Sequence, residues 1–131
     1  MASASTQPLA KKLLIKAGDT ISTIAAPTGY KALLGPLPDG AEIVHRAPSG
    51  GASLVHLFIT TSAELETQLP RAQQAMVKGG GIWVSWPKKT SKQAGDISRD
   101  TIRAAAEEIG LRTVRAIAID DDWSALKLVA T

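Results

Sequence analysis

The sequence predicts an α/β protein, a three-layer sandwich with a mostly parallel six-stranded sheet. Short β-branched or apolar runs alternate with segments of helical period, which is typical of strand–helix–strand units. The runs at 53–61 and 81–86 are almost continuously apolar, as expected of adjacent central strands covered on both faces. The last two runs, 113–120 and 123–130, flank a short acidic turn and predict an antiparallel closing hairpin.

The first third of the chain predicts two strands and two short helical segments. A helix over 8–16 is indicated by Thr6 as cap and Pro8 in the first turn, and Gly18 ends it. The β-branched run 20–27 predicts a strand that Pro27 ends, and "AEIVH" predicts the next strand. Residues 28–35 between them are expected to form one or two helical turns.

Two longer helices follow, and we expect them to cover the two faces of the central strands. Thr61 and Glu64 have the spacing of a capping box at the start of a helix over 62–77, which Pro70 is expected to bend. Ser98 predicts the start of a helix over 98–109, and Gly110 its end. The glycines of "KGGG" are interpreted as a flexible turn between helix and strand.

Composition narrows the functional classes. The 131 residues suit one domain, expected over 8–131 after a disordered tail at 1–7. The absence of cysteine excludes disulfides and thiolate chemistry, and we expect a cytoplasmic protein without a signal peptide or a membrane span. The net charge of +3 is spread along the chain, so no specific nucleic-acid partner is expected, and nothing indicates an oligomeric state.

The order of elements from "SLVHLFITT" through "KGGGIWVSW" to the closing hairpin resembles the second half of the Rossmann-like methyltransferase fold. That resemblance implies a truncated version of the fold with strand order 2-1-3-4-6-5. The stretches "AAPTGYKALLGPLPDG", "WVSWPKK" and "DDWSALKLV" are also similar to a family of uncharacterised bacterial proteins, a domain of unknown function, over about residues 9–129.

The methyltransferase resemblance implies a site for S-adenosylmethionine, but the sequence departs from it at two places. Such enzymes use a glycine-rich turn after the first strand, whereas "AAPTGYK" has Gly29 as its only glycine and a proline that lacks an N–H. They place an acidic residue at the end of the second strand, where this chain has His45 and Arg46. We therefore expect no cofactor, with S-adenosylmethionine as the alternative.

Other catalytic signals are weak. His56 lies inside "LVHLF" and is interpreted as a hydrogen-bonded core histidine rather than a base or ligand. The serines lack a nucleophile elbow, and "DDD" at 120–122 is interpreted as a solvated turn rather than a metal site. No catalytic or metal-binding residue is assigned.

The candidate binding site lies at the carboxyl ends of the strands, where open α/β sheets take their ligands. This edge should gather cationic and aromatic side chains from several loops, namely Tyr30, His45, Arg46, Lys88, Lys89, Lys92 and Trp123. Such a rim suits an anionic small molecule or an acidic protein surface. The alternative is that these lysines are simply solvated and the tryptophans are core residues.

The sequence thus favours a non-catalytic ligand- or partner-binding module with a degenerate methyltransferase-like fold. The alternative is a small S-adenosylmethionine-dependent methyltransferase.

Overall fold

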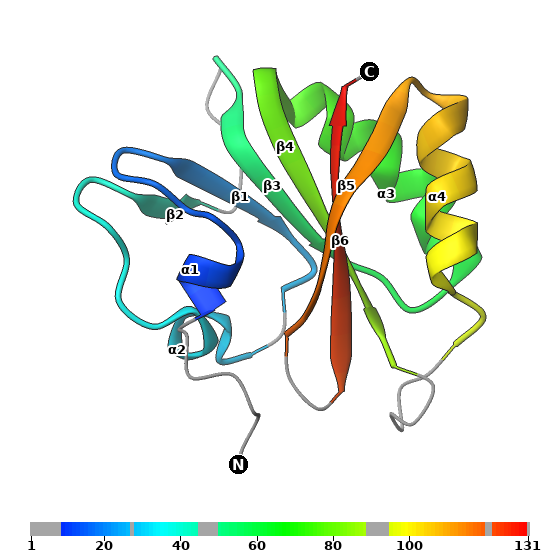
Figure 1. The fold of residues 1–131 in the computed structure, drawn as a ribbon, viewed down its shortest axis with the longest axis horizontal. Helices are drawn as coiled ribbons and strands as arrows, with labels where there is room; N and C mark the ends of the chain where they lie inside the picture. Colours follow the sequence, from blue (N-terminus) through cyan, green and yellow to red (C-terminus); the bar gives the residue numbers. More distant parts are fainter. Residues whose placement is uncertain (1–8, 27, 45–49, 89–94, 120–121, 131) are drawn as a thin grey trace.

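Six strands form one mixed sheet in the order β2-β1-β3-β4-β6-β5, which confirms the predicted topology (Figure 1). The computed structural model describes residues 9–26, 28–44, 50–88, 95–119 and 122–130. The first four strands pair in parallel, and β6 pairs antiparallel with both β4 and β5. The strands are β1 Thr20–Ile24, β2 Glu42–Val44, β3 Ala52–Phe58, β4 Met76–Pro87, β5 Leu111–Ala118 and β6 Trp123–Ala130.

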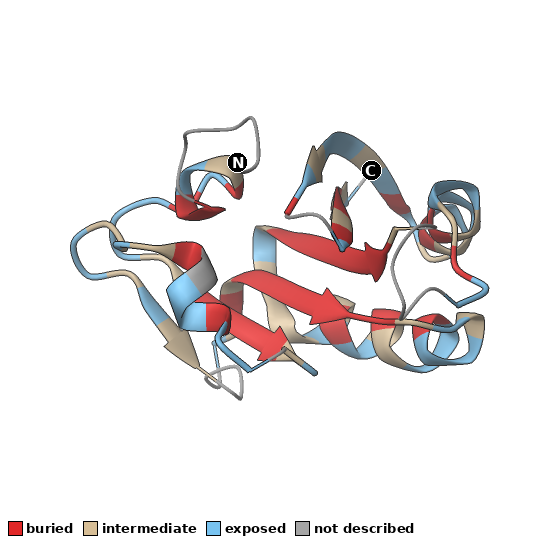
Figure 2. Ribbon diagram, turned by 90° about the horizontal axis from the view of Figure 1, so that it is seen from below, coloured by how far each residue is buried: buried red, intermediate tan, exposed pale blue. Residues whose placement is uncertain are grey.

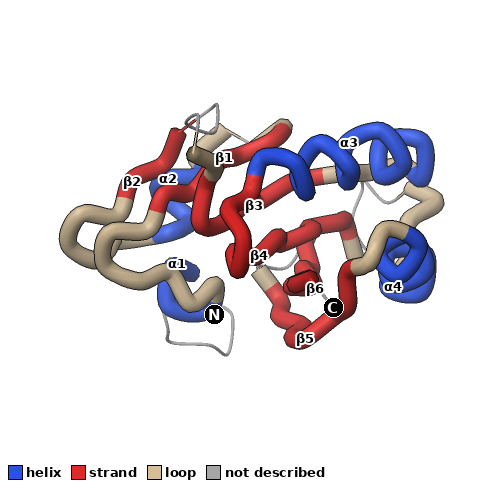
Figure 3. Tube along the Cα trace, turned by 90° about the horizontal axis from the view of Figure 1, so that it is seen from above, coloured by secondary structure: helices blue, strands red, loops and turns tan. Residues whose placement is uncertain are grey.

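The two long helices lie on the same face of the sheet, so the expectation that they cover opposite faces is wrong (Figure 3). These are α3 (Ser62–Ala75) and α4 (Arg99–Glu108). The chain moves across the sheet in one direction from β3 to β4, and in the other direction from β1 to β2. Because parallel crossovers are right-handed, this reversal puts α3 on one face and α2 (Tyr30–Leu34) on the other. The short helix α1 (Leu9–Lys12) lies on the same face as α2.

Side chains cap both long helices as predicted. The Thr61 hydroxyl accepts a hydrogen bond from the Glu64 N–H at 3.1 Å, and the Glu64 carboxylate accepts one from the Thr61 N–H at 3.1 Å. The Ser98 hydroxyl accepts from the Thr101 N–H at 3.2 Å. Gly110 follows α4 with a φ of 81°, a left-handed conformation that ends a helix at little cost for glycine.

Strand β4 begins earlier than predicted, because "KGGG" is part of the strand and not a turn. The register with β3 shifts between the pair Ala52–Met76 and the pair Leu54–Gly81, so the extra residues of β4 form a bulge. Gly80 lies so close to β3 that a Cβ there would be 2.9 Å from the Ser53 carbonyl oxygen. Glycine is therefore needed for the bulge to lie against its neighbour.

The first helix is shorter than predicted. Its end is formed by Leu14, whose φ is 62°, and by a hydrogen bond from the Ile15 N–H to the Ala10 carbonyl at 3.1 Å. This is the Schellman pattern with leucine at the position that glycine usually takes. Strand β1 ends before Ala25, which has a φ of 59°. The predicted tail at 1–7 and the cap at Thr6 lie outside the described residues.

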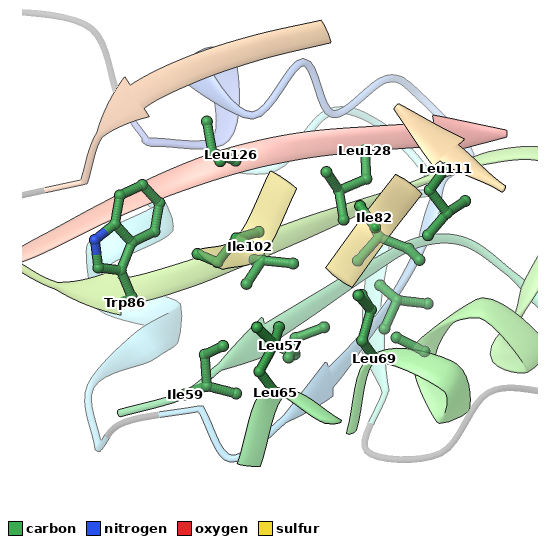
Figure 4. Close-up of a cluster of buried hydrophobic side chains, with 14 of the residues drawn as sticks. Leu57, Ile59, Leu65, Leu69, Ile82, Trp86, Ile102, Leu111, Leu126 and Leu128 are labelled. Carbon is green, nitrogen blue, oxygen red and sulfur yellow. The ribbon is translucent and has the colours of Figure 1, made fainter. Parts of the chain in front are cut away.

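Two clusters of buried side chains flank the sheet, and the central strands are buried along most of their length (Figure 2). The first cluster lies between the sheet and the helices α3 and α4, and comprises residues such as Leu57, Leu69, Ile82, Ile102 and Leu128 (Figure 4). The second lies between the sheet and α1 and α2, and includes Leu13, Leu34, Phe58, Trp83 and Trp123. No helix among the described residues is long and apolar enough to cross a membrane.

Candidate functional site

The carboxyl ends of the parallel strands lie together at one edge of the sheet. Strand β3 ends at Phe58, and β4 ends at Pro87, which pairs with Trp123 at the start of β6. The next residue, Lys88, donates its backbone N–H to the Asp122 carbonyl at 2.7 Å. The main chain of Lys88 is therefore held beside the closing hairpin, where the sheet ends.

Three of the seven predicted site residues fall within the described part of the chain. Tyr30 and Trp123 are 5% and 8% exposed, so they lie beneath this edge and not on its surface. Lys88 is half-buried. The other four, His45, Arg46, Lys89 and Lys92, lie outside the described residues, and their place in the site stays a prediction.

A row of aromatic rings connects the two buried residues of the predicted site. Phe58 lies between them, with its ring centre 5.6 Å from that of Tyr30 and 5.1 Å from that of Trp123. Both contacts are edge-to-face, a favourable geometry for aromatic pairs. These rings fill the space under the carboxyl ends of β3 and β4 on the side of α2.

His56 comes two residues before Phe58 on the same face of β3, and both of its ring nitrogens are hydrogen-bonded. The Tyr30 hydroxyl is 2.6 Å from Nδ1, and the Ser85 hydroxyl is 2.5 Å from Nε2. A neutral imidazole has one donor and one acceptor nitrogen, so one hydroxyl donates to the ring and the other accepts from it. The His56 ring also stacks on Phe58, with 4.4 Å between ring centres. The prediction of a hydrogen-bonded core histidine is confirmed.

Burial determines the protonation states of His56 and Tyr30 in this hydrogen-bonded group. His56 is fully buried, and the loss of solvation lowers its pKa to about 3. Burial also raises the pKa of the Tyr30 hydroxyl above its ordinary value. His56 is therefore neutral and Tyr30 protonated near neutral pH. With both nitrogens bonded, His56 joins β3 to β4 and to α2 but cannot exchange a proton with a solvent-borne substrate.

Sequence reasoning did not identify Tyr30 and Ser85 as the partners of His56. Ser85 could have been found, because "GIWVSW" and "LVHLF" each contain one polar residue in an apolar run, and such residues on adjacent strands tend to pair. Phe58 and Ser85 are in register, which brings Ser85 within reach of His56. Tyr30 gave no such signal, because it comes from a helix of only five residues.

The turn after β1 is where the methyltransferase resemblance implies a cofactor. Gly29 precedes α2 with a φ of 87° and provides no side-chain cap. The next residue, Tyr30, turns its ring inward against His56 and Phe58. Among the described residues, no group of three or more His, Cys, Asp or Glu side chains could hold a metal ion.

The sheet order and the helix arrangement define an α/β protein with a methyltransferase-like fold. Residues 52–131 match the model of a family described as protein of unknown function (DUF3052), and the chain belongs to that family. No curated protein matches the sequence.

Solved structures with this fold include methyltransferases. The chain resembles an S-adenosylmethionine-dependent methyltransferase from Aquifex aeolicus, at a TM-score of 0.60 and 13% identity over 98% of this chain and 94% of that one. It resembles the fibrillarin pre-rRNA processing protein of Methanococcus jannaschii at 0.63 and 11%, over 96% and 70%. It also resembles a "possible exported protein" from Bordetella parapertussis at 0.65 and 13%, covering 92% of this chain but spanning only 65% of that protein. At these identities the likeness shows the fold alone.

Proposed function

We propose that this protein is a non-catalytic binding module built on a methyltransferase-like fold. The observation that carries the proposal is the buried row of Tyr30, Phe58 and Trp123 at the carboxyl ends of the central strands. Ligands of open α/β sheets lie at this edge, near the switch in strand order between β1 and β3. In this protein, aromatic side chains fill the space beneath it.

The chemistry of the buried polar groups supports the same proposal. General acid–base catalysis needs a group that titrates near the working pH and reaches the substrate. His56 meets neither condition, since it is fully buried and has a pKa of about 3. Within the described residues, this site therefore has a rigid hydrogen-bonded support but no titrating histidine.

We propose that the ligand is anionic and binds above the aromatic row, at the loop that follows β4. Lys88 starts this loop and is fixed by the hairpin, and Lys89 and Lys92 follow it in the sequence. A loop that leaves a rigid sheet is a common way to present binding groups. His45 and Arg46, after β2, add cationic character to the proposed site.

Thermal shift measurements with a panel of nucleotides and phosphorylated metabolites would test this proposal. We expect at least one of them to stabilise the protein, and the Lys88→Ala/Lys89→Ala variant to respond less, most clearly at low salt. The control is Arg71→Ala/Arg112→Ala, which removes two exposed positive charges elsewhere. Equal responses of the two double variants would contradict the assignment, and no response of the wild type to any compound would reject a small anionic ligand.

The alternative function is a small S-adenosylmethionine-dependent methyltransferase. One observation favours it: the structural match with the Aquifex aeolicus methyltransferase extends over nearly the whole of both chains. Calorimetric titration with S-adenosylmethionine and S-adenosylhomocysteine distinguishes the two. We expect no heat of binding, because the turn after β1 has only one glycine and the sequence has His45 and Arg46 where such enzymes have an acidic residue, whereas micromolar affinity would establish the alternative.

A further inference from the structure

A cavity at the amino ends of the strands, opposite to the proposed site, gathers positive charge. It has a volume of about 210 Å³. Four separate segments contribute to its wall, namely the loop before β1, the start of β3, the bulge of β4 and the end of β6. Its polar lining residues are Lys16, Asp19, Ser53, Lys78 and Lys127, beside the backbone of Gly79, Gly80 and Gly81.

Lys127 is held at this cavity by its packing. Its ammonium lies 5.9 Å from the centre of the Trp83 ring, and its stem passes over Gly81, where a Cβ would be only 3.0 Å from the lysine Cε. A side chain at position 81 would require this stem to shift by a few tenths of an ångström. Trp83 is itself fixed, because its indole N–H donates to the Leu13 carbonyl at 3.1 Å. The position of the Lys127 charge is therefore set by the core.

The charges around Lys127 repel it more than they attract it. Burial lowers its pKa, and Lys16 and Arg115 lower it further, whereas Asp19 raises it. Arg115 is the residue of β5 directly opposite Lys127, and like charges in that position destabilise a sheet. The Asp19 carboxylate accepts the backbone N–H of Lys16 at 2.8 Å. Neither Lys16, Lys78 nor Lys127 forms an ion pair with a described residue.

Part of the cavity wall is main chain that hydrogen bonds and close packing hold in place. The Ser53 hydroxyl accepts from the Thr20 N–H at 2.8 Å and donates to the Thr20 carbonyl at 3.1 Å, which locks β1 to β3 at this point. Gly79 has a φ of 83°, and Gly80 leaves no room for a Cβ beside Ser53. The bulge thus brings the main chain of three glycines to the wall of a cavity that Lys16, Lys78 and Lys127 also line.

From this concentration of unpaired cations around a preformed cavity, we propose a second binding site, for a phosphate-type oxyanion. An anion there would relieve the repulsion among the ammonium groups and form charge-assisted hydrogen bonds with them. The volume lies below the roughly 300–1,000 Å³ of pockets for drug-sized molecules, which favours a small ion over a whole nucleotide. This site does not depend on the function proposed for the carboxyl edge.

Titration with inorganic phosphate, followed by amide chemical shifts, tests the proposal. We expect saturable shifts of the amide signals of Gly79 to Gly81, and no such response to sodium chloride at the same ionic strength. Lys127→Met keeps an unbranched apolar stem over Trp83 and removes the charge, so it should weaken phosphate binding by about tenfold, whereas Lys127→Arg should retain it. The control is Arg71→Ala, which removes an exposed charge on α3 away from the cavity and should leave the phosphate-induced shifts of Gly79 to Gly81 unchanged.

Two results would overturn the proposal. One is the absence of saturable shifts at these glycines with phosphate. The other is equal phosphate affinity of wild type and Lys127→Met. The melting temperature of Lys127→Met without phosphate is a second measurement. It should be equal to or above that of the wild type, because the substitution removes a positive charge that its neighbours repel. A folded variant with that property and no loss of phosphate binding would show that the charge of Lys127 has no role in binding.

Discussion

Acidification should destabilise this protein through His56 before it protonates most carboxylates. The folded protein holds the pKa of His56 near 3, whereas an unfolded chain has a histidine pKa of about 6.5. Between these values the unfolded state binds one more proton than the folded state, so stability falls as the pH falls. The slope approaches about 1.4 kcal/mol per pH unit below pH 6, and the integrated loss between pH 6.5 and 4.5 is about 2.3 kcal/mol. From about pH 7.5 upward, His56 should contribute almost no pH dependence, because the unfolded chain is then also deprotonated.

Urea unfolding at a series of pH values measures this slope. The comparison is His56→Gln, which keeps an amide able to hydrogen-bond but cannot titrate in this range. The difference between the two proteins isolates His56 from the carboxylates. The imidazole NMR signals of the wild type provide a second test that does not depend on the variant. The chain has two histidines, and a His45→Gln variant identifies the signal of His56. A His56 signal that titrates near pH 6.5 in the folded protein would refute the reasoning.

Three further substitutions test the packing. Phe58→Ala should cost about 3–5 kcal/mol in chemical denaturation, because the ring is 4% exposed and contacts other rings; an almost unchanged midpoint would count against the aromatic row. Gly80→Ala should lower the melting temperature through the clash with the Ser53 carbonyl, whereas Gly50→Ala, which meets nothing within 4 Å, should not; equal effects would argue against the bulge. Thr61→Ala should lower the free energy of unfolding by about 1 kcal/mol, because it removes the side-chain cap of α3. The control is Thr67→Ala, on the exposed side of the same helix. If Thr61→Ala loses no more stability than this control, the cap contributes little.

Local signals in the sequence were sufficient for the starts of α3 and α4 and for the end of α4, whereas the strand order came from the resemblance to the methyltransferase fold. The caps at Thr61 and Ser98 and the stop at Gly110 depend on neighbouring residues, so the sequence could predict them. The bulge at "KGGG" could not be predicted in this way, because it depends on how closely Ser53 approaches Gly80 across two strands. The common face of α3 and α4 follows from the direction of the crossovers, which the predicted strand order already contained.

The candidate site was less accessible to sequence reasoning. Tyr30 and Trp123 were expected at the rim, and they lie beneath it because each has an aromatic partner in Phe58. Aromatic residues next to loops can face either way, and the sequence does not say which pairing will bury them. The bonded state of His56 was predicted from its apolar neighbours, but its partners required the register of β3 with β4 and the position of α2.

The division of the core also bears on how the chain folds during synthesis. All the buried residues of the first cluster lie between Ala52 and Leu128, and among the described residues of the earlier part of the chain only the partly buried Ile24 packs against them. The second cluster joins residues from the first 34 positions to β3, β4 and β6. The segment with α1, β1 and α2 therefore leaves the ribosome before the strands it must cover exist. It adds at the edge of β3 and on one face, so it can dock last without threading through the remainder of the fold. Until it docks, Trp83 and Phe58 face water, and this interval is when a nascent chain is most exposed to aggregation.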